Sequence, residues 1–487
     1  MRDFITLIKR ISPEWIIYKF SELSIDMFKK QECCRDIQVP VKIYGRQRTL
    51  VVALSAWDIQ NIEYLSICNS NDYRQSDKPF SFGELVDLYR DYDNKHSIAE
   101  EIKDADLDGI FRLIMGMTAE QFQYQNGSWI FDTFNRNYHI LLAAPNFEHR
   151  ADLSIDDVVQ KVFGFSANDY ISIMLIVFWL CMQHPDPLTA PEALYRKKEE
   201  TILTKENVSK FVDYYSCTYQ ELRVTSLGKQ LLYSKPFIKT DRQKAYLSSN
   251  FYLVAMLIAN GLYWTVRDFY RIQGGQGFTN AFGHLYEDYI KELANTYCKP
   301  EQWHVIPQGK EKGADFFFDF GDASVIIESK ASLIGLDGKQ QVPNRESIDK
   351  FMYNTIDKAY IQLQSSYNQI IDKQKECKPI IKVILLYDDF SNTAILQKSM
   401  TRIFNNDARC FIMRIREFEI LLYLHFYDNL KCHAIIKCLI EQSSLTPLER
   451  KSVSAIYDQF KVWEISHFNG ELDYFSQGIT RLEREIK

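Results

Sequence analysis

The sequence predicts an α+β multidomain protein with a large, mainly helical N-terminal region, a compact α/β unit and a helical C-terminal segment. The 487 residues are 46% hydrophobic, which is enough to bury about two or three cores. Apolar runs of helical length dominate residues 1–273. Short β-like runs alternating with helices follow, and this order is typical of an α/β unit.

The N-terminal region, residues 1–273, has one early exception to its helical pattern. In "VPVKIYGRQRTLVVAL" two β-rich runs flank a turn that contains Gly45, so we expect a β-hairpin near residues 38–55. The most apolar runs begin at Tyr170 and Phe251, and both are shorter than the ~20 residues that span a bilayer. We therefore expect two buried helices and no membrane contact.

A glycine-rich stretch, "RIQGGQGFTN", interrupts the helical pattern, and we expect a hinge between domains there. The second predicted domain covers residues 274–427. It begins with a helix, "NAFGHLYEDYIKELANTY", and continues with three short strands, a helix over 347–372 and two more strands. The last segment, residues 428–487, is predicted to be helical.

Bulk properties exclude several classes of protein. The net charge of −6 and the pI near 5.9 exclude a strongly basic nucleic-acid-binding chain, although a local basic surface stays possible. The ten cysteines form no C-x-x-C pair, which argues against a zinc ribbon or a secreted disulfide framework. The N-terminus has no signal-peptide pattern, so we expect a cytoplasmic protein.

The strand "SVIIESKAS", residues 324–332, carries two charged residues on one side of the pleat. If the preceding "FGD" closes a two-residue hairpin loop, Asp319 faces Ser324 and Asp315 faces Glu328. Directly opposed side chains lie about 5 Å apart, so two carboxylates there repel unless a cation or a proton intervenes. Such a pair suits Mg²⁺, or Mn²⁺ in its place.

Lys330 lies about 6.6 Å further along the same side of this strand, opposite Gly313, which has no side chain to block it. Its ammonium group is placed to meet a phosphate. Two carboxylates that hold a metal ion, with an amine beside them, match the needs of phosphodiester hydrolysis. An E-x-K tripeptide is also common on a solvated strand face, but the opposed Asp315 and the apolar surroundings favour a site. Asp319, the rival acid, is placed opposite Ser324.

The succession of a helix with "FGHLYEDY", then "GADFFFDF", "VIIESKAS" and a helix with "KAYIQL" resembles the PD-(D/E)xK nuclease superfamily. This resemblance covers about residues 275–415 and implies a restriction-endonuclease-like fold. It implies that Asp315 and Glu328 bind the divalent metal and that Lys330 activates water or stabilises charge. Ala314 stands where the superfamily frequently has Pro.

The resemblance also implies further site residues. The backbone carbonyl of Ser329 would complete the metal shell, and Glu287 on the preceding helix would be an additional acid and metal ligand. On the following helix, Lys358 and Gln362 would be the polar residues of the site. These two are four positions apart and are predicted to share a helix face.

We expect a metal-dependent nuclease that acts on DNA as an endonuclease. The helical N-terminal region would recognise a substrate, a signal, a protein partner or a second copy of the chain. Nucleases with large extra domains resemble bacterial restriction and anti-phage defence proteins in layout. Two alternatives stay open: an RNA-directed nuclease that uses the same residues, and an inactive nuclease-fold scaffold or sensor that binds nucleic acid or protein without cutting.

Overall fold

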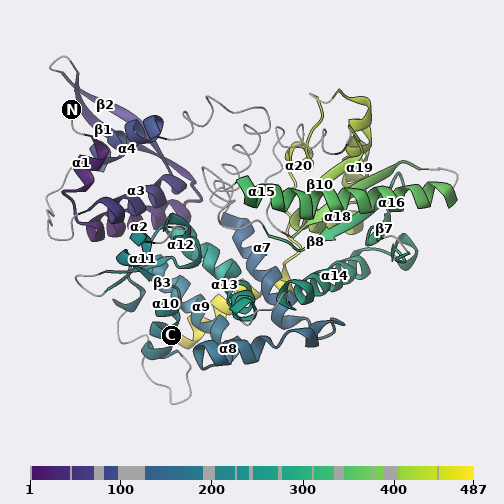
Figure 1. Cartoon of the computed structure of the whole chain (residues 1–487), viewed down its shortest axis with the longest axis horizontal. Coiled ribbons are helices and arrows are strands. Elements are labelled where there is room, and N and C mark those ends of the chain that lie inside the picture. The colour runs from purple at the N-terminus through teal and green to yellow at the C-terminus, as the bar shows by residue number, and fades with distance from the viewer. Residues whose placement is uncertain are drawn as a thin grey trace.

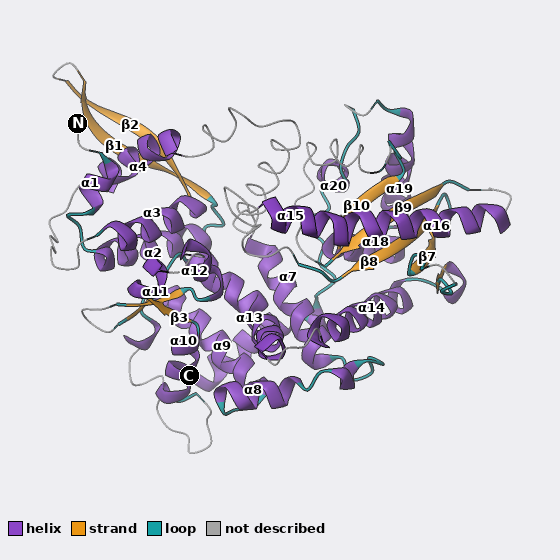
Figure 2. Cartoon of the chain, in the orientation of Figure 1, coloured by secondary structure: helices purple, strands orange, loops and turns teal. Residues whose placement is uncertain are grey.

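The computed structural model shows a mixed α+β chain in which helices surround three small sheets (Figures 1 and 2). In the view of Figure 1 the N-terminal helices lie on the left and the largest sheet lies on the upper right. The structure describes residues 3–43, 46–70, 82–96, 127–189, 203–224, 228–240, 245–272, 277–309, 312–333, 345–373, 378–387, 404, 406–446 and 449–486.

A long hairpin lies where the sequence predicts one. Strands β1 (Cys34–Ile43) and β2 (Arg46–Ser55) pair antiparallel, with Ile43 opposite Arg46. The predicted turn with Gly45 lies outside the described residues. The hairpin packs with α3 (Ala56–Asn69) and α4 (Phe82–His96), and Arg35 on β1 forms an ion pair with Asp26 on α2 (Pro13–Lys29). Pro13 stands in the first turn of α2, where its missing N–H leaves no helical hydrogen bond unmade.

The two most apolar runs are buried helices. They form α9 (Ala167–Gln183) and α13 (Phe251–Ile272), which pack against each other and against α7 (Gly127–Tyr138) and α8 (Ile155–Phe163). Among the described residues no helix is by itself long and apolar enough to cross a membrane. Only the bent pair 150–163 and 167–183 meets that length and composition when its two members are taken together.

Short elements complete this region. They are α1 (Phe4–Ile8), the π-helix η1 (His139–Ala143), α10 (Lys205–Tyr214), α11 (Tyr219–Val224), α12 (Leu231–Ser234), the strands β3 (Ser216–Thr218), β4 (Phe237–Lys239) and β5 (Tyr246–Ser248), and the 3₁₀ turns η2 (Arg150–Asp152), η3 (Pro187–Thr189) and η5 (Gly228–Gln230). The expected glycine hinge falls on residues 273–276, outside the described ones, and Gly277 begins the next helix, α14 (Gly277–Tyr297).

The five strands predicted after α14 form one mixed sheet in the order β10-β9-β8-β7-β6. Its strands are β6 (Trp303–Val305), β7 (Phe316–Asp319), β8 (Ser324–Lys330), β9 (Ile380–Leu386) and β10 (Cys410–Arg414), and the 3₁₀ turn η6 (Pro300–Gln302) precedes them. The pairs β6–β7 and β7–β8 are antiparallel, whereas β8–β9 and β9–β10 are parallel. Every residue of β9 is buried, as expected for an apolar strand between two neighbours.

The sheet lies between two helical layers. Alternate residues of each strand face opposite sides, so each face of the sheet packs against a different layer. Phe316, Phe318 and Ile327 join a hydrophobic core that continues from Phe4 to Leu482 through the N-terminal helices. The other face is covered by one long helical segment made of α15 (Arg345–Phe351), the π-helix η7 (Met352–Asp357) and α16 (Lys358–Lys373). This segment also provides the crossover between the parallel strands β8 and β9.

The C-terminal residues divide between the two regions. The helices α18 (Ile415–Tyr427), α19 (Asn429–Glu441) and α20 (Val453–Phe460) pack together and against the sheet, with the 3₁₀ turns η8 (Gln442–Ser444) and η9 (Gly470–Leu472) between elements. The last helix, α21 (Tyr474–Ile486), returns to α7 and α9. There the ring of Phe475 lies 4.3 Å from that of Phe131 and 5.7 Å from that of Phe178, centroid to centroid.

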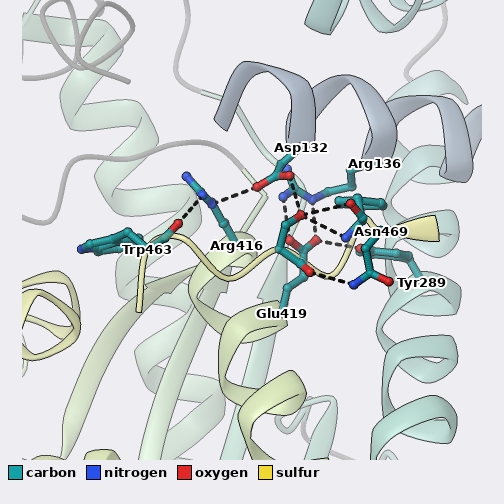
Figure 3. Close-up of polar contacts among 9 residues, drawn as sticks. Asp132, Arg136, Tyr289, Arg416, Glu419, Trp463 and Asn469 are labelled. Carbon is teal, nitrogen blue, oxygen red and sulfur yellow. Dashed lines mark hydrogen bonds and ion pairs between the residues drawn. The ribbon is translucent and has the colours of Figure 1, made fainter. Parts of the chain in front are cut away.

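A buried polar network joins the helical region to the sheet region (Figure 3). The guanidinium of Arg136 on α7 donates to both carboxylate oxygens of Glu419 on α18, at 2.6 and 2.8 Å, and the hydroxyl of Tyr289 donates to Glu419 at 2.7 Å. Burial alone would raise the pKa of Glu419, but Arg136 outweighs it and holds that pKa below its usual range. Nearby, Arg416 forms an ion pair with Asp132 at 3.1 Å.

Replacing Arg136 with Ala should lower the free energy of unfolding by about 3–5 kcal/mol, because it leaves Glu419 as an uncompensated buried charge. Lys19→Ala, which breaks the exposed Lys19–Glu22 pair, is the matched control and should cost less than about 1 kcal/mol. Denaturant unfolding of both variants measures the difference. Equal losses in the two variants would contradict the importance of the buried pair.

Candidate active site

The hairpin between β7 and β8 has the predicted register from Phe316 to Asp319. Phe317 pairs with Ile326 and Asp319 with Ser324, and Gly321 takes a positive φ of 87° in the two-residue loop. A left-handed first loop residue suits the right-handed twist of a hairpin and favours glycine.

The register changes at Asp315, where the sequence predicts a direct pair with Glu328. The Asp315 N–H donates instead to the carbonyl of Ile327, the residue already paired with Phe316, at 2.9 Å. Two consecutive residues therefore face one, which is the arrangement of a β-bulge. Bulges redirect side chains, and this one brings the carboxylate of Asp315 to the end of β8.

Ser329 holds that carboxylate in place. Its backbone N–H and its hydroxyl both donate to Asp315 Oδ2, at 2.8 and 2.7 Å. This contact was not predicted from the sequence, which assigns Ser329 only a backbone carbonyl in the metal shell. Two donors on one oxygen fix the orientation of the carboxylate.

Helix α16 clamps the residues before Asp315. The N–H of Ala314 donates to Ser366 Oγ at 2.7 Å, and Gln362 Nε2 donates to the carbonyl of Gly313 at 3.3 Å. A Cβ atom at position 313 would stand 2.6 Å from Ser366 Oγ, so this close approach requires glycine. Ser366 and Gln362 are one helical turn apart and hold the same short segment.

Glu328 lies at the centre of the site and is 1% exposed. Its Oε1 accepts a hydrogen bond from Lys330 Nζ, whereas its Oε2 is buried and has no hydrogen-bond partner among the described residues. Burial, and then the negative charge of Asp315, raise the pKa of Glu328 to about 7, although Lys330 opposes this shift. An additional cation is therefore needed to keep Glu328 fully ionised.

Lys330 and Gln362 form the other half of the site. Besides Glu328, the amine of Lys330 bonds Gln362 Oε1 at 3.1 Å, and its side chain is 15% exposed. Gln362 thus connects Lys330 to the backbone at Gly313 through its two amide atoms. The structure brings these two predicted residues together.

Glu287 on α14 approaches from the opposite helical layer. It is partly buried, and its pKa is raised first by that burial and then by the charge of Asp315. Its neighbours Leu285 and Tyr289 face the core. Glu287 is therefore a third carboxyl group whose electrostatic partner in the site is Asp315.

Two other candidates from the sequence analysis, Lys358 and Asp319, lie away from this site. Lys358 is exposed, and its amine donates to Asn354 Oδ1 at 2.8 Å, one turn earlier, because helical side chains point toward the N-terminus. The structure does not bring Lys358 to the other site residues. Asp319, the rival acid, forms an ion pair with Lys378 at 2.8 Å near the turn of the hairpin.

The donor set fits a hard divalent cation such as Mg²⁺ or Mn²⁺. Carboxylate oxygens are the ligands that these ions prefer, and Glu328 Oε2 is a buried acceptor with no described partner. Asp315 and Glu328 would hold the ion, with Glu287 close enough to add charge. A role for the Ser329 carbonyl stays a prediction.

Comparison with protein-family models, with curated proteins and with solved structures gives no match for this chain.

The raised pKa of Glu328 predicts a pH dependence of stability. Because the folded state binds this proton more tightly than the unfolded state, the contribution of Glu328 to stability is greatest below about pH 4.5 and falls as pH rises to about 7. Relative to Glu328→Gln, which cannot titrate, the wild type should lose about 3 kcal/mol over that interval.

Unfolding of both proteins at several pH values measures this difference. Saturating Mg²⁺ should reduce it, because a bound cation favours the ionised carboxylate. A difference that stays constant from pH 4.5 to pH 8 would contradict the burial of an unbalanced Glu328.

Proposed function

We propose that this chain is a divalent-metal-dependent nuclease, with a restriction-endonuclease-like domain at residues 274–427, that hydrolyses phosphodiester bonds in DNA. The observation that carries the proposal is Glu328 Oε2, which is buried, has no hydrogen-bond partner among the residues that the structure describes, and belongs to a carboxylate that is influenced by the charge of Asp315 and bonded by the amine of Lys330. The order of elements from α14 through the β7–β8 hairpin to α16 supports it, since it agrees with the resemblance to the PD-(D/E)xK superfamily.

Each residue of the site has a chemical task in this proposal. Asp315 and Glu328 would hold Mg²⁺, which supplies polarisation of the phosphate and activation of a water molecule when it is bound. Lys330, held at the partly exposed end of β8 by Gln362, offers an ammonium group to the negative charge that develops on the phosphate. Glu287, with its raised pKa, can accept a proton more readily than an exposed carboxylate.

Removing either half of the site should abolish cleavage. We expect Lys330→Ala to lower the rate of Mg²⁺-dependent DNA cleavage by about 10²–10³-fold, because it removes a preorganised cation, and Glu328→Ala to lower it at least as much. Nicking and linearisation of plasmid DNA, followed over time, measure the rates. Circular dichroism checks that each variant is folded.

Asp319→Ala is the matched control, since Asp319 is an acid of the same hairpin that pairs with Lys378 outside the site. It should keep activity within about threefold of the wild type, the effect expected of a partly exposed ion pair. Full activity of both Glu328→Ala and Lys330→Ala would refute the assignment.

A substrate panel tests the choice of DNA, which rests on the resemblance alone. Plasmid, linear duplex, single-stranded DNA and RNA are incubated with the purified chain, with and without Mg²⁺. The proposal expects cleavage of DNA only with the metal. Cleavage of RNA alone would make the chain an RNA-directed nuclease, and no cleavage together with no Mg²⁺ binding would favour a scaffold.

A further inference from the structure

A second group of metal-binding side chains lies beside α14, at its contact with the segment that follows η1. His149 precedes the 3₁₀ turn η2, Asp152 ends it, and His284 projects from α14. Each residue offers one atom that could bind a metal, and these three atoms lie within 4.8 Å of one another. His284 Nδ1 is 4.0 Å from Asp152 Oδ2, and the rings of His149 and His284 are 4.7 Å apart, centroid to centroid.

The buried side chain of Asp288 orients His149. Its Oδ2 lies 3.0 Å from His149 Nδ1 and also accepts the backbone N–H of His149 at 3.0 Å, while Lys291 Nζ bonds its Oδ1 at 2.9 Å. With an amine and a backbone N–H on it, the Asp288 carboxylate is an acceptor, so Nδ1 of His149 is the donor. The lone pair of the neutral imidazole is then on Nε2.

Metal-binding histidines commonly have this partnership, in which one ring nitrogen donates to a carboxylate and the other binds the ion. The carboxylate fixes the tautomer and the ring orientation before the metal arrives. His149 therefore has the carboxylate partner that metal-binding histidines commonly have.

We propose that His149, Asp152 and His284 bind one first-row transition-metal ion of the Zn²⁺ class. Two imidazoles and one carboxylate suit Zn²⁺, Co²⁺ or Ni²⁺ and do not suit Mg²⁺, which prefers oxygen ligands alone. Ligand atoms around Zn²⁺ at ~2.1 Å stand about 3.4 Å apart in a tetrahedron. The observed 4.0 Å needs only a small side-chain rotation, and the side chains of Asp152 and His284 are 47% and 51% exposed.

Three protein ligands leave one position of a tetrahedral ion for water or another oxygen. The site is separate from the proposed Mg²⁺ site, since it includes neither Asp315 nor Glu328. It is nevertheless close to the candidate active site. His284 is one helical turn before Glu287, and its charge acts on that carboxyl group.

The test uses the full-length Glu328→Ala variant, so that the proposed catalytic ligand cannot contribute. After chelator treatment and dialysis it is titrated with Zn²⁺ by isothermal calorimetry. We expect one equivalent of Zn²⁺ to bind. Introducing His284→Ala as a second substitution should weaken that binding by more than about tenfold. Asp288→Asn should weaken it by about 10–100-fold, the loss typical of removing an orienting partner.

His433→Ala is the control, because His433 is another surface histidine that pairs with an acid, Asp322, at 2.7 Å. His433→Ala should leave Zn²⁺ binding unchanged. In a titration with Mg²⁺ instead of Zn²⁺, the variants with and without His284→Ala should behave alike. Absence of Zn²⁺ binding in the parent, or equal affinity with and without His284, would overturn the proposal. Neither result bears on the nuclease assignment, which depends on Asp315, Glu328 and Lys330.

Discussion

A carboxylate buried in a protein stays ionised only when a positive charge or several donors compensate it. Glu328 is under this constraint, since one of its oxygens has a single donor in Lys330 and the other has none among the described residues. The negative charge of Asp315 acts on Glu328 and on Glu287 as well. The divalent cation that we propose would compensate this negative charge.

The surrounding structure holds these charges in place from three sides. The bulge at Asp315 and the donors of Ser329 fix one carboxylate, while Gln362 fixes the amine. The end of β8 is also tied to the helical region. The N–H of Tyr387 donates to the carbonyl of Lys330 at 3.0 Å, and the Tyr387 hydroxyl donates to Asn137 on α7.

Asn137 in turn donates to the carbonyl of Ala259 on α13 at 2.6 Å. Arg136, on the same helix as Asn137, pairs with Glu419 on α18. Together these bonds make the N-terminal helices part of the support of the candidate site. The continuous hydrophobic core from Phe4 to Leu482 has the same consequence. Strand β8 and the helical region therefore form a single packed body in the described residues.

Much of the sheet was predictable because its signals are local. Short β-like runs identified the strands, and the "FGD" loop gave the hairpin register from Asp319 to Phe316. The same register placed Glu328 and Lys330 on one side, and the resemblance to the nuclease superfamily indicated Gln362. Ser366 lies four positions after Gln362 and so shares its helix face, so a signal for it was present in the sequence.

The remaining features depend on contacts between distant segments. The bulge at Asp315 is stabilised by the hydrogen bonds of Ser366 to Ala314 and of Gln362 to Gly313. No pattern in "GADFFFDF" predicts it. The direction of Lys358 depends on the π-helical turn before it and on Asn354. The return of α21 to α7 and α9 rests on aromatic contacts such as Phe475 with Phe131, which join residues more than 300 positions apart.

A crystal structure of the full chain soaked in Mn²⁺, with the ion located by its anomalous scattering, tests the central claim most directly. We expect an anomalous peak within about 2–2.3 Å of one oxygen each of Asp315 and Glu328, the range of metal–carboxylate distances. Glu328 Oε2 should be one of these ligands. A well-occupied Mn²⁺ elsewhere with no peak between these two carboxylates would contradict the account.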